Sequence, residues 1–171
     1  MSDRKFPLAA TSVVFVAAAA TAVVGSTVST VSAAPSSLQN QIDAQLTAHP
    51  GGVQTAPNEI SYQGGKVTLT FPQPGHTSAN PCAKGAYCFY DGANFTGRKL
   101  TFRDCDSTQF LTDYGFGDKT SSWTNATKHT IEVYDQNVQP WKLLWTQYAG
   151  AASVNVGSAA DNKADFFNTT C

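Results

Sequence analysis

Charged side chains are scarce in this sequence. Asp, Glu, Lys and Arg make up 13% of the 171 residues, and the formal net charge is −1. A nucleic-acid-binding surface needs clustered lysines and arginines, so the composition argues against a nucleic-acid partner. Gly, Ser, Thr and Asn are abundant instead, which is typical of a secreted, β-rich protein.

Signatures of catalytic and metal sites are also missing. The sequence contains no GxSxG, no HExxH and no Gly-rich phosphate loop. The three histidines, His49, His76 and His129, are scattered, and no two cysteines have CxxC spacing, which argues against a zinc site. We therefore expect a protein that is not an enzyme.

Charge is absent altogether from Phe6 to Ile42. This stretch follows two basic residues, is rich in Ala and Val, and reaches small residues of the kind that signal peptidases cut after. The pattern predicts a signal peptide over residues 1–33 and a secreted, extracellular protein without a membrane segment. A retained membrane-spanning helix is the alternative, because the stretch is long enough to cross a bilayer.

Four cysteines follow the leader, at Cys82, Cys88, Cys105 and Cys171. In an exported chain two disulfides are expected, and four cysteines allow three pairings, among which the sequence does not choose. We favour Cys82–Cys88 with Cys105–Cys171, because the first pair can close around the turn between its cysteines.

Residues 34–81 are expected to form an extension of one helix and one hairpin, followed by a linker. Leu38, Ile42 and Leu46 recur on one helical face, and strand-like alternation follows over residues 58–71 on both sides of a Gly-Gly turn. The extension either packs on the rest of the protein or is a propeptide or partner-binding arm. The first interpretation is favoured because the apolar helix stripe needs burial.

Residues 82–171 contain short strand-like runs separated by turn residues, which predicts a β-sandwich or Greek-key domain. Near its start, Tyr90, Phe95 and Gly97 have the spacing of a folded-over hairpin. In such a turn the Tyr90 ring lies across the turn, Phe95 enters the core, and Gly97 has a positive φ or leaves space for the ring.

Tyr90-x4-Phe95-x-Gly97 resembles the signature of βγ-crystallins. The stretch from Gly117 to Trp123 resembles their calcium loop, with Asp118, Ser121 and Ser122 at matching positions and Gly117 in place of the first acidic or amide residue. Residues 161–166 form a weaker second match. The resemblance implies a mainly β, βγ-crystallin-like Greek-key sandwich, preceded here by a short helix and a β-hairpin extension.

The same resemblance implies a calcium site. Asp118, Ser121, Asp161 and Asp165 are the possible ligands, together with backbone carbonyls, because Ca²⁺ prefers hard oxygen donors. The alternative is that both loops are turns capped by Asp, Ser and Asn. No cofactor is required, and calcium is the one that the residues allow.

Most of residues 36–171 also resembles secreted actinobacterial proteins of the metalloproteinase-inhibitor group, peptidase inhibitor family thirty-six. The similar elements include IDAQLTAHPGG, NEISYQGGKVTLTF, CAKGAYCFY and NFTGRKLTFRDC. This resemblance implies a disulfide-bonded inhibitor whose partner is a secreted metalloprotease. We expect the protein to be a monomer. The loops Asp135–Pro140 and Gly150–Gly157 are the candidate inhibitory loops, with Val138 as an apolar anchor. The second short-range cysteine pair that closes such a loop in the group is absent.

An extracellular module without a protease target is the alternative function, either calcium-stabilised and structural or binding a cell-wall glycan. Trp123, Trp141, Trp145 and Tyr148 would supply an exposed aromatic patch for a glycan. These residues could equally fill the core, an interpretation favoured for Trp123 and left open for Trp141.

Overall fold

The computed structural model describes residues 37–73, 75, 81–105 and 108–169. The predicted signal peptide and Cys171 lie outside the described residues. Among the residues described, no helix is long and apolar enough to cross a membrane.

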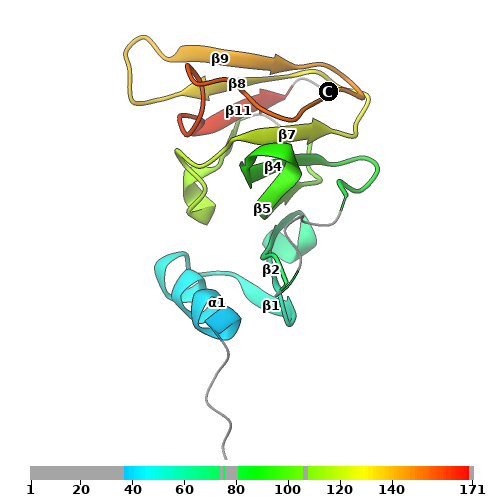
Figure 1. Ribbon diagram of the computed structural model, residues 1–171, viewed down its shortest axis with the longest axis vertical. Coiled ribbons are helices and arrows are strands. Elements are labelled where there is room, and N and C mark those ends of the chain that lie inside the picture. The colour runs from blue at the N-terminus through cyan, green and yellow to red at the C-terminus, as the bar shows by residue number, and fades with distance from the viewer. Residues whose placement is uncertain (1–36, 74, 76–80, 106–107, 170–171) are drawn as a thin grey trace, which may run out of the picture. The chain divides into compact units, whose positions relative to one another are not determined.

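Strands dominate the described chain (Figure 1). The helix is α1 (Ser37–Ala48), and the short 3-10 turns are η1 (Gln63–Gly65), η2 (Ala93–Phe95) and η3 (Thr112–Tyr114). The strands are β1 (Val53–Ala56), β2 (Glu59–Tyr62), β3 (Val67–Thr70), β4 (Tyr87–Gly92), β5 (Thr96–Phe102), β6 (Thr108–Phe110), β7 (Ser122–Asn125), β8 (Ile131–Asp135), β9 (Lys142–Gln147), β10 (Ala152–Ser153) and β11 (Phe166–Thr169).

The strands form two antiparallel sheets. One has the order β1-β2-β3-β5-β4-β7-β10, and the other has the order β6-β11-β8-β9. Strands β4 to β7 and β8 to β11 are two successive four-stranded motifs, and each motif gives its third strand, β6 or β10, to the sheet of the other. The predicted mainly β, βγ-crystallin-like Greek-key sandwich is thus confirmed.

The predicted helix and hairpin are both present. Helix α1 buries Ile42 completely and packs Leu38 and Leu46 partly against the core. Strands β2 and β3 pair around Gly64 and Gly65, whose φ values are +64° and +96°. The sequence did not predict β1, which pairs with the outer side of β2.

The extension is joined to the following strands by backbone pairing. β3 pairs with β5 from Val67 opposite Phe102 to Thr70 opposite Lys99, so one sheet runs across the expected boundary at residue 81. On α1, the buried Gln45 side chain donates to the Tyr114 carbonyl over 2.9 Å and to the Tyr62 hydroxyl over 3.3 Å. These contacts agree with the interpretation that the helix stripe packs on the protein rather than forming a free arm.

Aromatic side chains fill the space between the two sheets. Phe167 of β11 is fully buried, and its ring lies 5.7 Å from Tyr87, 5.1 Å from Phe89 and 4.9 Å from Phe102. These three partners come from β4 and β5 of the other sheet. Phe167 therefore holds the last strand of the chain against the first motif.

Candidate functional site

The turn that carries the aromatic signature is folded over as the sequence predicts, with one difference. The Tyr90 and Phe95 rings meet at 5.4 Å in a T-shaped contact, and Gly97 has a φ of +76°. Phe95 does not enter the main core, as had been expected. It packs, partly buried, in a small separate cluster with Tyr90 and the Cys82–Cys88 disulfide, because the turn places it on the side of β4 that faces away from the other sheet.

Ser122, the first residue of β7, fastens this turn to that strand. Its fully buried hydroxyl donates to the Gly92 carbonyl over 2.6 Å and accepts from the Phe95 amide over 3.0 Å. Ser122 occupies the last position of the calcium-loop pattern. Its role in the described structure is therefore to hold the fold-over in place.

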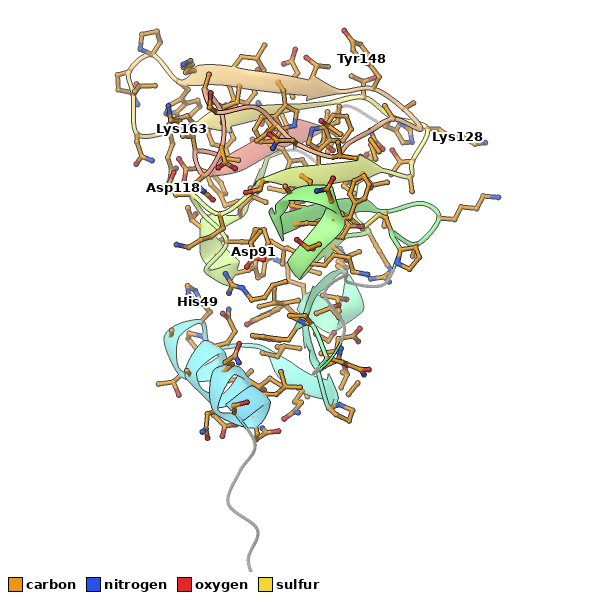
Figure 2. The ribbon with its side chains drawn as sticks, in the orientation of Figure 1. His49, Asp91, Asp118, Lys128, Tyr148 and Lys163 are labelled. Atoms are coloured by element: carbon orange, nitrogen blue, oxygen red, sulfur yellow. A yellow bond between two sulfur atoms is a disulfide. The ribbon has the colours of Figure 1, made fainter. Side chains whose placement is uncertain are left out.

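The two loops with calcium-loop spacing lie against each other. The Asp118 amide donates to the Ala164 carbonyl over 3.0 Å, and the Asn162 amide donates to the Thr120 carbonyl over 3.2 Å. Asp118 and Asn162 both have a φ of +55°, a left-handed conformation that Asp and Asn tolerate. Figure 2 shows Asp118 and Lys163, one from each loop, at the same end of the sheets.

All four predicted calcium ligands belong to this pair of loops, where they form two groups. The Ser121 hydroxyl donates to an Asp161 carboxylate oxygen over 2.6 Å. The Asp118 and Asp165 carboxylates both accept from the side-chain amide of Asn137, over 3.3 Å and 3.0 Å. Asn137 lies in the loop between β8 and β9, and its contact with these loops was not predicted from the sequence.

Asp165 is the buried member of its group. Burial raises the pKa of its carboxyl, the Gln136 amide that donates to it over 3.0 Å opposes this shift, and the negative charges of Asp118 and Asp135 add to it. Asp118 and Asp135 are thus near enough to Asp165 to affect its ionisation, and the Asn137 side-chain amide bridges Asp118 and Asp165. The described residues nevertheless include no group of three or more His, Cys, Asp or Glu side chains arranged to hold a metal ion. A cation here would need hydroxyl, carbonyl or water oxygens to complete its coordination.

The candidate inhibitory loop Asp135–Pro140 begins at this acidic group. The Asn137 amide donates to Asp135 over 2.8 Å, and the peptide bond between Gln139 and Pro140 is cis. Val138 directly follows Asn137, and 41% of its surface is exposed. The loop therefore has a fixed start and an accessible apolar residue.

The other candidate loop, Gly150–Gly157, also exposes a valine. Val154 is exposed, while its carbonyl accepts from the Asn94 amide over 2.8 Å. The Val156 amide donates to the Ser121 carbonyl over 3.0 Å. Hydrogen bonds thus tie this loop to the turn after β4 and to the loop from Gly117 to Trp123.

The four aromatic residues expected to make one patch are separated. Trp123 is buried, as predicted for a core residue, and Trp145 packs partly buried against the core. Trp141 and Tyr148 are 57% and 67% exposed. The prediction of a glycan-binding patch that uses all four residues is therefore wrong.

Cys82 and Cys88 form the disulfide that the sequence favours. Cys105 is also disulfide-bonded, and its expected partner, Cys171, lies outside the described residues. The Cys82–Cys88 bond joins the segment before β4 to the second residue of that strand.

Residues 75–138 match the family model described as peptidase inhibitor family I36. The matched segment covers a little over a third of the chain. It includes the aromatic signature, the loop from Gly117 to Trp123 that resembles a calcium loop and, at its end, Val138. The family resemblance is thus confirmed over residues 75–138. No curated protein matches the chain.

Solved structures similar to the chain are βγ-crystallin domains. A domain from Clostridium beijerinckii is 19% identical, with 49% of this chain and 95% of that chain covered and a TM-score of 0.41. A βγ-crystallin from Ciona intestinalis is 20% identical, with 50% of this chain and 100% of that chain covered and a TM-score of 0.39.

Proposed function

We propose that this protein is a secreted peptidase inhibitor that acts on metalloproteases. The match of residues 75–138 to peptidase inhibitor family I36 is the observation that carries the proposal. The leader pattern and the disulfides support the extracellular location. A protease is the macromolecular partner, and the protein acts on it as a monomer.

The loop Asp135–Pro140 is the proposed inhibitory element. Its backbone is held before Val138 by the bonds from Gln136 to Asp165 and from Asn137 to Asp135. A loop fixed in this way loses little conformational entropy when it enters a cleft, so more of the contact energy appears as affinity. Val138 would fill an apolar pocket of the kind that thermolysin-like enzymes use for the residue after the cleaved bond.

Val138→Asp tests this assignment. We expect the variant to raise the inhibition constant against a thermolysin-like metalloprotease by about thirtyfold or more, because an unpaired carboxylate in an apolar pocket costs at least about 2 kcal/mol. Since Val138 is exposed, the fold should tolerate the change.

Val154→Asp is the matched control, because it introduces the same charge at an exposed valine of the other candidate loop. Unchanged inhibition by Val138→Asp together with lost inhibition by Val154→Asp would move the inhibitory element to Gly150–Gly157. Wild-type protein that inhibits no metalloprotease would refute the proposed function itself.

Calcium stabilisation is a second proposed function, favoured by the adjacent carboxylates of Asp118 and Asp165. Asp118, Asp165, Ser121 and Asp161 are the side chains that would contribute, and the three carboxylates among them carry the charge that a divalent cation needs. Bound calcium would neutralise the mutual repulsion of the acidic group. Calcium bound here would stabilise the structure.

Calcium should therefore raise the melting temperature of the wild-type protein. At a calcium concentration of about one hundred times the dissociation constant, ligand linkage gives about 2.7 kcal/mol of added stability. Asp118→Ala should abolish the shift, whereas Asp43→Ala, on the exposed surface of α1, should retain it. Calorimetry with and without a chelator measures both variants, and an equal shift in the two would show that the loops do not hold calcium.

A further inference from the structure

The outer face of the four-stranded sheet carries a continuous row of large apolar side chains. Backbone pairing places Phe110 opposite Phe166, Phe166 opposite Tyr134, and Tyr134 opposite Leu143. Ile131, Val133 and Phe167, at the alternate positions, are buried in the core, so this row faces away from it. We call Phe110, Phe166, Tyr134, Leu143 and the adjoining Trp141 the aromatic row.

Phe166 is the support of this row. The rings of Phe110, Tyr134 and Trp141 lie 5.7, 5.1 and 5.0 Å from its centre, with Tyr134 stacked and Trp141 in an edge-to-face contact. These neighbours leave Phe166 1% exposed although it lies on the outer face. Trp141, Phe110 and Leu143 remain 57%, 38% and 46% exposed. The row thus presents accessible apolar surface on a rigid base.

A row of polar side chains runs beside the aromatic row, one outward position further along each strand. Pairing places Thr108 opposite Asn168, Asn168 opposite Glu132, and Glu132 opposite Thr146. The Thr108 hydroxyl donates to Asn168 over 2.7 Å, and the Tyr134 hydroxyl donates to Glu132 over 2.6 Å. Hydroxyl, amide and carboxylate groups are therefore held at fixed positions along the edge of the apolar surface.

We propose that this face binds an extended, uncharged glycan. A sugar ring has an apolar face that packs on aromatic side chains and a rim of hydroxyls that bonds to amides and carboxylates. Neighbouring strands are about 4.8 Å apart, which is close to the advance of a β-linked glycan per sugar unit, so successive units can meet successive strands. Neither row contains a lysine or an arginine, which disfavours polyanionic ligands.

This function is separate from protease inhibition and does not rest on it. Val138 lies in the loop that leads into β9, outside both rows. A protein that inhibits a protease while it is bound to an insoluble glycan would act at the surface where the protease works. The glycan site differs from the four-residue patch considered from the sequence, of which it retains Trp141 alone.

The test uses the oxidised full chain expressed with its own leader. The probes are the hexasaccharides of β-1,4-linked N-acetylglucosamine and of β-1,4-linked glucose, followed by tryptophan fluorescence, with insoluble chitin and cellulose for sedimentation. We expect saturable binding to at least one hexasaccharide. Trp141→Ala should weaken it by about tenfold or more, equivalent to about 1.4 kcal/mol. Trp141→Phe should retain part of the affinity.

Tyr148→Ala is the matched control, because Tyr148 is also exposed but lies after β9 and outside both rows (Figure 2). It should bind like the wild type, and so should Val138→Asp, which separates this site from the inhibitory loop. Absence of binding at millimolar hexasaccharide, or equal binding by Trp141→Ala and wild type, would overturn the proposal. Self-association that Trp141→Ala abolishes, without glycan binding, would assign the face to a second copy of the chain and would also overturn it.

Discussion

Phe167→Ala is expected to lower the free energy of unfolding by about 3–5 kcal/mol, the usual cost of removing a buried phenylalanine side chain. Phe167 is fully buried and contacts the rings of Tyr87, Phe89 and Phe102 across the two sheets. Its removal leaves a cavity that three large, rigid neighbours cannot fill. Urea unfolding followed by tryptophan fluorescence measures the loss.

Phe110→Ala is the control for this prediction. Phe110 lies on an edge strand of the same sheet, is 38% exposed, and its ring contacts that of Phe166. Its loss should cost about 1 kcal/mol or less, because much of its surface is already in water. If Phe167→Ala cannot be purified folded, Phe167→Leu should show a smaller loss in the same direction. Equal losses at positions 167 and 110 would contradict the assignment of Phe167 to the space between the sheets.

Gly97→Ala is the second substitution with a large expected effect. We expect it to lower the free energy of unfolding by about 3 kcal/mol. Part of this loss is conformational, because a φ of +76° costs a residue with a side chain about 1–2 kcal/mol. The rest arises because the added Cβ would overlap the Asp91 carboxylate. Asp91 cannot move away without loss of its bonds from the Arg98 amide, at 2.6 Å, and the Arg98 guanidinium, at 2.7 Å.

Gly150→Ala separates the two contributions. Gly150 has a similar φ of +72°, but a Cβ there would meet no atom within 4 Å. Its replacement should therefore cost the conformational part alone, about 1–2 kcal/mol. Asp91→Ala combined with Gly97→Ala should recover part of the packing cost. Equal losses in the two single variants would show that Asp91 does not close over Gly97.

Much of the fold could be predicted because short-range patterns specify it. The spacing of Leu38, Ile42 and Leu46 predicts α1, and the Gly-Gly turn with alternating neighbours predicts the β2–β3 hairpin. The strand-like runs that were predicted between residues 82 and 171 each contain a strand. β6 was not predicted, since its three residues are too few for a two-residue alternation to be visible, and it is positioned by pairing with β11 far along the chain.

The face on which a side chain lies was harder to predict. Leu143 pairs opposite Tyr134 and Trp145 opposite Val133, so a register shift puts these two residues of β9 on opposite faces although they are two apart. Phe166 and Phe167 are adjacent and equally apolar, and only strand pairing decides which is in the core. For this reason the sequence placed Trp141 and Trp145 together, whereas the structure separates them.

The candidate site was predicted only in part, because strand pairing also decides which distant loops meet. The spacing in two loops singled out Asp118, Ser121, Asp161 and Asp165 as possible calcium ligands, and these residues lie in two loops that bond to each other. It did not reveal Asn137, which reaches Asp118 and Asp165 from the loop between β8 and β9. A contact between segments distant in sequence has no local signal, except that an Asp-Gln-Asn run directly follows a strand.

Inhibition of a protease is the central claim, and titration at enzyme concentrations above the inhibition constant tests it most directly. Increasing amounts of the oxidised, secreted protein are added to a thermolysin-like metalloprotease at fixed calcium, with a serine protease as the control. We predict a linear fall in metalloprotease activity to an end point at one inhibitor per enzyme, with the serine protease unaffected. Full metalloprotease activity at a large molar excess of the protein would contradict the claim.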